Sequence, residues 1–181
     1  MKKFCIFFLL SIIISVTALG FLGVFSSQEQ ESTADFLRIH IRADSNTEEA
    51  QTIKYVVRDE VVNYLTPIVA ECESKQAAVQ GIGAHVDDIA RVATNTLNEH
   101  GLGYTASVRL DRETFPTRVY NGYTLPQGEY TALIIELGAG KGDNWWCVVY
   151  PPLCFASPTG KNVVYKSKIA EIIAKWKEKR A

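Results

Sequence analysis

The sequence contains only three histidines, His40, His85 and His100, and it lacks the spacings with which proteins usually hold a metal ion. No His-x-x-x-His, Cys-x-x-Cys or EF-hand pattern is present. A Gly-x-Ser-x-Gly motif and a papain-like cysteine motif, either of which would indicate a nucleophile, are absent as well. We therefore expect no catalytic residues, no metal and no cofactor, and we predict that the protein is not an enzyme.

A phosphate-binding loop is also missing, although the stretch from Gly138 to Gly142 is rich in glycine. The Walker pattern requires four residues between its glycines and a Ser or Thr after the lysine, whereas Gly142 follows Lys141 here. The stretch is therefore predicted to be a hairpin turn. No nucleic-acid partner is expected.

Charged residues are absent from Phe4 to Phe25, directly after the N-terminal Met-Lys-Lys. This order is typical of a secretory signal or a membrane anchor. As a helix, the 22 uncharged residues would reach about 33 Å, enough to cross a bilayer, yet Val16-Thr-Ala18 and Ala18-Leu-Gly20 offer the small residues that a signal peptidase needs. Cleavage and retention both stay open, and in either case the chain after Gln28 is expected to lie outside the cytoplasm.

The chain is predicted to have three segments: a signal peptide or anchor at 1–27, a polar linker at 28–34 and a single domain at 35–181. Charge is uneven within that domain, because residues 35–160 carry 10 basic and 16 acidic groups, whereas 161–181 carry 7 basic and 2 acidic groups. The basic end of the chain is either the solvated face of a helix or a contact for anionic lipid or an acidic partner.

The part predicted to be exported contains three cysteines, Cys72, Cys147 and Cys154. An odd number in an exported protein predicts one disulfide and one free thiol. Because Pro151-Pro152 can turn the chain back between Cys147 and Cys154, this pair is the first candidate for a disulfide. The alternative is that all three are small buried apolar residues.

The first part of the domain reads as a strand followed by two helices. Apolar residues alternate with Arg38, His40 and Arg42 from Phe36 to Ala43, which is the period of a strand with one polar face. A helix is expected at 48–66, capped by Ser45 or Asn46 and ended near Pro67, and a second helix from Ser74 to about Gly101.

The second part reads as strands joined by short turns. Alternation predicts a strand at 104–111, and Pro116 makes the weaker strand at 115–120 an edge strand. The segment 129–137 is apolar enough for the centre of a sheet, and 145–150 is predicted to be the last strand. A final helix is expected at about 163–178. Short connections favour antiparallel pairing, so the predicted class is α+β: a mainly antiparallel sheet packed with two or three helices, preceded by an N-terminal signal or anchor helix.

Adjacent tryptophans, Trp145 and Trp146, are expected to point to opposite faces of their strand, which leaves one of them exposed if only one face is covered. Trp146 with Tyr150 would then form a patch suited to a partner. The alternative is that both faces are covered. The charged residues of the first strand and of the following helix either keep the domain soluble or form a docking surface.

The run from Asn144 to Phe155, NWWCVVYPPLCF, resembles the most characteristic block of the stage II sporulation protein R family, together with the glycine-rich stretch before it. The likeness covers most of residues 36–156. Further blocks that resemble the family's, in the same order, are Leu37-Arg38-x-His40, Ala43-Asp-Ser-Asn46, Lys54-x-x-Val-Arg-Asp59 and Gly128-x-Tyr130. Within the second of these blocks, Asp44-Ser45-Asn46 departs from the order that is usual in the family, Asn-Ser-Asp.

The resemblance implies an intercellular signal of endospore-forming bacteria, which is secreted from the forespore into the space between its two membranes. It also implies a partner, the membrane-bound protease stage II sporulation protein GA, which processes pro-sigma-E and is activated by binding. Alternatives are a cell-wall or peptide-binding module that uses the same aromatics, and a secreted thiol hydrolase that uses Cys147 or Cys154 with His40. The residues expected to contribute to a partner-binding surface are Arg38, His40, Arg42, Arg58, Asp59, Asn144, Trp145, Trp146 and Tyr150.

Overall fold

The computed structural model describes residues 35–120, 123–155 and 166–179. The predicted signal peptide or anchor at 1–27 and the linker at 28–34 lie outside these residues. Residues 35–181 group into one compact unit. Within the described ranges, no helix has both the length and the apolar character needed to cross a bilayer.

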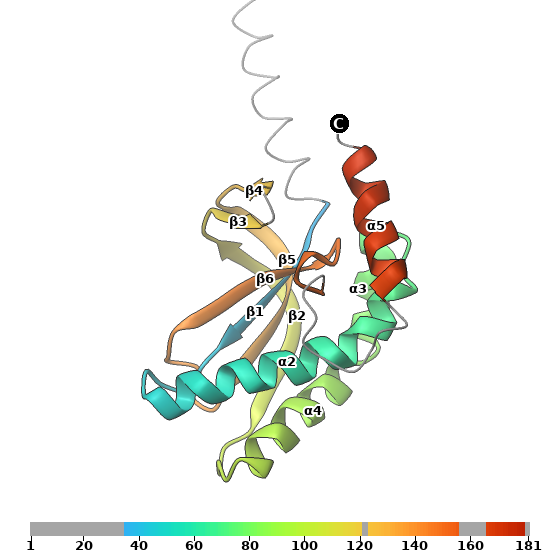
Figure 1. The fold of residues 1–181 in the computed structure, drawn as a ribbon. Coiled ribbons are helices and arrows are strands. Elements are labelled where there is room, and N and C mark those ends of the chain that lie inside the picture. Colours follow the sequence, from blue (N-terminus) through green and yellow to red (C-terminus); the bar gives the residue numbers. More distant parts are fainter. Residues whose placement is uncertain (1–34, 121–122, 156–165, 180–181) are drawn as a thin grey trace, which may run out of the picture. The chain divides into compact units, whose positions relative to one another are not determined.

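A four-stranded sheet forms the centre of this unit, with its strands in the order β2, β5, β1, β6 (Figure 1). The two central strands, β1 and β5, are parallel, and the outer pairs are antiparallel. The α+β class is as predicted, but the sheet is mixed rather than mainly antiparallel, because the long connection through three helices and β2 brings the chain back to the starting end of β1. The strands are β1 (Leu37–Arg42), β2 (Ala106–Phe115), β5 (Gly128–Leu137) and β6 (Asn144–Tyr150).

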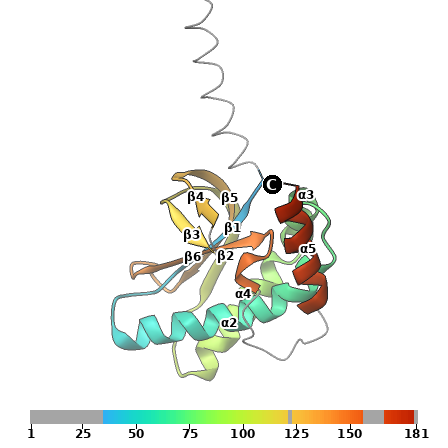
Figure 2. The same ribbon diagram turned by 45° about the horizontal axis from the view of Figure 1, so that its top comes forward.

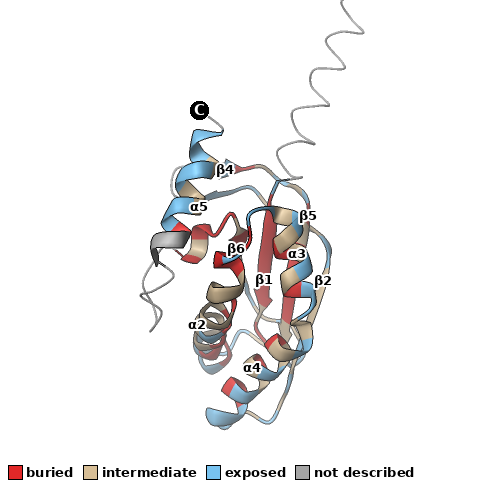
Figure 3. Ribbon diagram, turned by 90° about the vertical axis from the view of Figure 1, so that its right-hand side faces the viewer, coloured by how far each residue is buried: buried red, intermediate tan, exposed pale blue. Residues whose placement is uncertain are grey.

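Three helices cover one face of the sheet (Figures 1 and 3): α2 (Glu48–Ala70), α3 (Lys75–Gly83) and α4 (Val86–Glu99). The prediction that α2 ends near Pro67 is wrong, because the helix continues through this proline. The continuation buries Val69 and Ala70, which offsets the one hydrogen bond that proline cannot donate.

Hydroxyl side chains cap the starts of α2 and α3. Thr47, rather than Ser45 or Asn46, caps α2, since its Oγ1 accepts the N–H of Ala50 at 3.2 Å. Ser74 caps α3, so the second helix begins where the sequence predicts. The single helix expected after Ser74 is divided into α3 and α4.

The main core lies between these helices and the sheet. Alternate residues of β1 point into it, so Ile39 and Ile41 are buried as the period of the sequence predicts. Valines of α2, at positions 57 and 61, meet them from the helix side. Burial of such apolar side chains is the main favourable term in folding.

The other face of the sheet is covered only in part. A separate hairpin, β3 (Arg118–Tyr120) with β4 (Tyr123–Leu125), lies on this side, away from α2 and α4 (Figure 2), and the strand predicted at 115–120 is divided between β2 and β3. The hairpin closes a smaller apolar cluster together with η1 (Leu153–Phe155) and α5 (Lys166–Glu178). The buried residues of this cluster are Phe36, Phe115, Leu125, Tyr130, Ala132, Ile134, Val148 and Leu153.

Candidate partner-binding surface

The residues singled out in the sequence lie on two faces of the sheet. Trp145 and Trp146 point to opposite faces, as predicted: Trp145 packs in the helix-side core and Trp146 in the smaller cluster. Both are half-buried, so neither is the exposed tryptophan that was expected. Tyr150 packs with the helix-side core and does not pair with Trp146, because a bulge opposite Leu37 shifts the alternation at the end of β6.

The charged face predicted for β1 is not solvated at its first two positions. Arg38 is 0% exposed and His40 is 3% exposed, because the β3–β4 hairpin and the end of β2 cover them. The guanidinium carbon of Arg38 lies 4.3 Å from the ring centre of Phe115, 4.9 Å from that of Tyr130 and 5.4 Å from that of Tyr120. Stacking on three rings compensates part of the cost of burying this charge.

Polar contacts of Arg38 connect β1 to the hairpin and to β6. Its Nε donates to the carbonyl of Cys147 at 2.9 Å, and Nη2 donates to the Tyr120 hydroxyl, also at 2.9 Å. Tyr120 in turn donates to the carbonyl of Trp146 at 3.0 Å. Burial lowers the pKa of Arg38 and raises the pKa values of Tyr120 and Tyr130, so the phenols stay neutral beside the cation.

His40 joins three strands through both ring nitrogens. Nδ1 lies 2.7 Å from Oε2 of Glu113 on β2, and Nε2 lies 2.7 Å from Oδ1 of Asn144 on β6. Since an ionised carboxylate only accepts, Nδ1 carries a proton. The imidazole also lies 5.3 Å from the ring of Trp146. We find no nucleophile bonded to this histidine among the described residues.

Arg42 begins an ion-pair network at the open end of the same face. It bonds to Glu113 and, at 2.7 Å, to Oε1 of Glu136, which also accepts from Arg109 at 2.8 Å through Oε2. The hydrogen bond from Arg109, followed by the charges of both arginines, lowers the pKa of Glu136.

Glu136→Gln is expected to change the response to acid. A carboxyl whose pKa is lowered by folding contributes stability above its unfolded value, near 4.5, and loses it as the pH falls through the folded value. The variant should lose about 1 kcal/mol at pH 7 and less at pH 3, measured by urea unfolding at both values. Glu129→Gln, at an exposed pair with Arg112, is the control. An equal loss for Glu136→Gln at both pH values would contradict this account.

Arg58, Asp59 and Trp145 come together on the helix side of β6. The guanidinium of Arg58 lies 5.6 Å from the ring of Trp145 and 4.9 Å from that of Tyr55, and it bonds to Asp59 at 2.7 Å. Tyr55 is 44% exposed and was missed in the sequence. Its position three residues before Arg58 on a helix is the signal that could have found it.

A similar arrangement lies on the other side of β6. The guanidinium of Arg118, on β3, lies 4.5 Å from the ring of Trp146, and its neighbour Val119 is 64% exposed. Among the residues that the structure describes, Tyr55 and Val119 are the exposed large apolar side chains. The β6 surface, as the term is used below, comprises Tyr55, Arg58, Asn144, Trp145, Trp146, Arg118 and Val119.

The outer edge of β6 is partly occupied. The Trp146 carbonyl accepts from Tyr120, and the N–H of Val148 donates to Sγ of Cys154 at 3.0 Å. Cys147 and Cys154 form a disulfide, with Cα atoms 6.2 Å apart. η1 follows directly and packs against the strand.

Cys72 is the free cysteine of the described residues, and it is buried. Burial raises the pKa of its thiol, which bonds to the carbonyl of Ile68 at 3.2 Å. We expect alkylation of the native, non-reduced protein to leave Cys72 unmodified until denaturant is added, while a peptide linking Cys147 and Cys154 is detected by mass spectrometry. Rapid labelling of Cys147 or Cys154 would contradict the pairing.

The glycine-rich stretch 138–143 is a turn, but the prediction of a hairpin is wrong. It joins β5 to β6 across the end of β1, which lies between them. Asp44, just after β1, accepts the N–H of Ala139 at 2.7 Å, and Asn46 accepts that of Asp143 at 2.6 Å. The buried Lys54 also donates to the Asp143 carbonyl at 3.0 Å. These bonds therefore hold the turn between β5 and β6 against the residues that follow β1. No group of residues suited to a metal ion occurs in the described part of the chain.

Comparison with known proteins agrees with the family resemblance seen in the sequence. The sequence model of the family described as stage II sporulation protein R matches residues 33–159. A curated relative, stage II sporulation protein R of Bacillus subtilis (strain 168), is 35% identical over 143 residues, which are 79% of this chain and 64% of the relative. The chain thus spans less than two thirds of that relative, and no solved structure matches it. By the extent of these matches, the chain belongs to the stage II sporulation protein R family.

Proposed function

We propose that this protein is an exported sporulation signal that activates a membrane-bound partner by binding it. Membership of the family supports a role in sporulation signalling. The partner that the family suggests is the protease stage II sporulation protein GA, which processes pro-sigma-E. The place of action is the space between the forespore and mother-cell membranes, reached through the uncharged N-terminal segment.

The β6 surface is the contact for this partner. Tryptophan, tyrosine and arginine contribute most of the energy at protein interfaces, and here each tryptophan of β6 carries a stacked arginine. The observation that carries the proposal is that Tyr55 and Val119, the exposed large apolar side chains of the described residues, each lie beside one of these stacks. The β6 surface is held in place by side chains of β1, which bond β1 to β2 and β6. These positioning residues are Arg38, His40 and Arg42.

Tyr55→Ser combined with Val119→Ser is expected to weaken binding to the membrane protease at least tenfold and to reduce processing of pro-sigma-E. Two interface side chains of about 1 kcal/mol or more each account for such a loss. Both side chains are exposed, so the fold should keep its unfolding midpoint. Binding is measured with the purified, membrane-reconstituted protease, and processing by immunoblot in sporulating cells.

The matched control is Asp111→Ser with Arg112→Ser, two exposed residues of β2. It should retain normal binding and processing. Full signalling by the Tyr55 and Val119 variant would remove the β6 surface from the contact. Binding to purified peptidoglycan, with none to the protease, would favour a cell-wall-binding module instead.

A further inference from the structure

A hollow of about 570 Å³ lies between the start of α2 and the end of α4. Glu48, Glu49 and Thr52 of α2 line it on one side, and Leu102, just after α4, lines it on the other. The three α2 residues are exposed, whereas Val56 at the inner wall is half-buried. The hollow is therefore open to solvent and has an apolar floor with an acidic rim.

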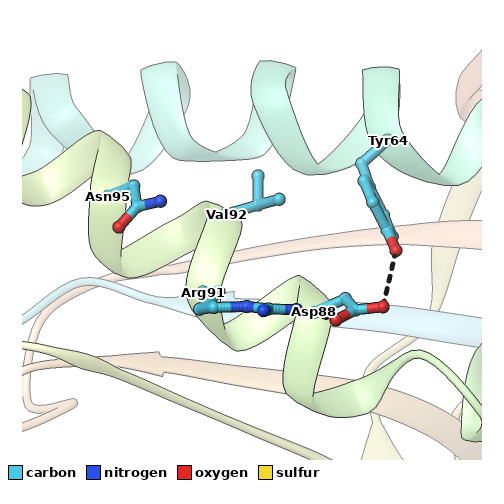
Figure 4. A pocket seen from close by; sticks show the side chains of 5 residues that line it. All are labelled: Tyr64, Asp88, Arg91, Val92 and Asn95. Carbon is cyan, nitrogen blue, oxygen red and sulfur yellow. Dashed lines mark hydrogen bonds and ion pairs between the residues drawn. The ribbon is translucent and has the colours of Figure 1, made fainter.

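A second hollow, of about 470 Å³, lies farther along the same pair of helices. Figure 4 shows Val92 of α4 pointing toward α2, and Tyr64 of α2 reaching to Asp88. The Tyr64 hydroxyl donates to Asp88 at 3.2 Å, and Arg91 pairs with the same carboxylate. Asn95 completes the lining.

Both hollows lie along the same pair of helices: residues at the start of α2 and after the end of α4 line the first, and residues of the later part of α2 and of α4 line the second. We name them together the α2–α4 groove. From Glu48 to Tyr64 there are 16 helical steps, or about 24 Å at roughly 1.5 Å per residue. A helix of four to five turns has this length.

The charge of the groove is negative. Glu48 and Glu49 stand at one end, and at the other Asp88 is neutralised by Arg91. Asp87 and Glu99 of α4 are exposed as well but line neither hollow, whereas His100 lines the first. The β6 surface, by contrast, carries Arg118, which has no ion-pair partner among the described residues, so the two surfaces suit segments of different charge.

We propose that the α2–α4 groove binds an amphipathic helix of a partner protein that carries lysine or arginine beside its apolar stripe. The stripe contacts Val56, Val92 and Leu102, in the way that helices dock into grooves between helices. The cations of that helix face Glu48 and Glu49. The groove shares no residue with the β6 surface, so this inference goes beyond the function proposed above.

Fluorescence anisotropy with a synthetic 16-residue probe tests the proposal on the full chain, held in nanodiscs of zwitterionic lipid if the N-terminal segment is retained. The probe has leucine at every third or fourth position and lysine elsewhere, and empty nanodiscs give the background. Glu48→Gln with Glu49→Gln should weaken binding roughly fivefold. Val56→Thr with Val92→Thr keeps side-chain shape, and it should also weaken binding, because hydroxyls enter the apolar floor.

Asp111→Asn with Glu178→Gln removes the same charge from exposed positions outside the groove, and it should leave the affinity within twofold. A shuffled probe of equal composition, without the apolar stripe, should bind much more weakly. Unchanged binding by either groove variant, or equal binding of the shuffled probe, overturns the proposal. None of these outcomes bears on the β6 surface, whose test uses the membrane protease.

Discussion

Gly142→Ala is expected to lower the free energy of unfolding by about 3 kcal/mol. A Cβ atom at this position would lie 2.2 Å from the carbonyl oxygen of Ser45 and 2.9 Å from Cβ of Ala43. Both neighbours belong to the chain just after β1, and Gly142 itself donates to the carbonyl of Ala43 at 2.8 Å. Because the obstacle is backbone, it cannot move aside without breaking the bonds that hold the 138–143 turn.

Urea unfolding followed by tryptophan fluorescence measures this loss, since Trp145 lies directly after the turn. Gly103→Ala is the matched control, because a Cβ there meets nothing within 4 Å. It should change stability by less than about 1 kcal/mol, in the favourable direction. A Gly142→Ala protein as stable as the Gly103→Ala protein would show that the turn does not approach Ser45 as closely as described.

Arg38→Ala is expected to be similarly costly, at about 3–5 kcal/mol. The change leaves a cavity among Phe115, Tyr120 and Tyr130, and it removes the donors to the Cys147 carbonyl and the Tyr120 hydroxyl. The loss should be visible as a lower midpoint in chemical denaturation. Signalling should fall with it, because the hairpin that presents Val119 is held to the sheet through Tyr120.

Arg38→Met separates packing from charge, since methionine fills a similar space without a buried cation. We expect it to cost about 1 kcal/mol or less, because replacing a buried charge by an apolar side chain is often neutral. Arg112→Ala removes an exposed ion pair with Glu129, and it should change the free energy of unfolding very little. If Arg38→Ala costs no more than Arg112→Ala, the buried stack does not hold the hairpin.

The periodicity of the sequence predicted the elements better than their pairing. The alternation in β1 correctly placed Ile39 and Ile41 in the core, and 129–137 lies at the sheet centre. The parallel pairing of β1 with β5 could not be read in this way, because it depends on where a long connection returns. The continuation of α2 through Pro67 depends likewise on tertiary burial, which a local rule for proline does not include.

The candidate site was predicted less completely. Alternation made Arg38 and His40 polar-face residues, but the hairpin that covers them has strands of only three residues, too short to show a period. Arg118 and Val119 were missed for the same reason. The reversed order Asp44-Ser45-Asn46 proves harmless to the turn, since each end residue provides a side-chain oxygen as acceptor, and both asparagine and aspartate can supply one.

An unpaired edge strand offers a template on which another chain can add strand after strand and aggregate. In this protein the two groups occupied at the β6 edge, the Trp146 carbonyl and the Val148 N–H, interrupt that template at its middle. Tyr120 and Cys154 thus occupy two of the backbone groups with which another chain would have to pair along this strand.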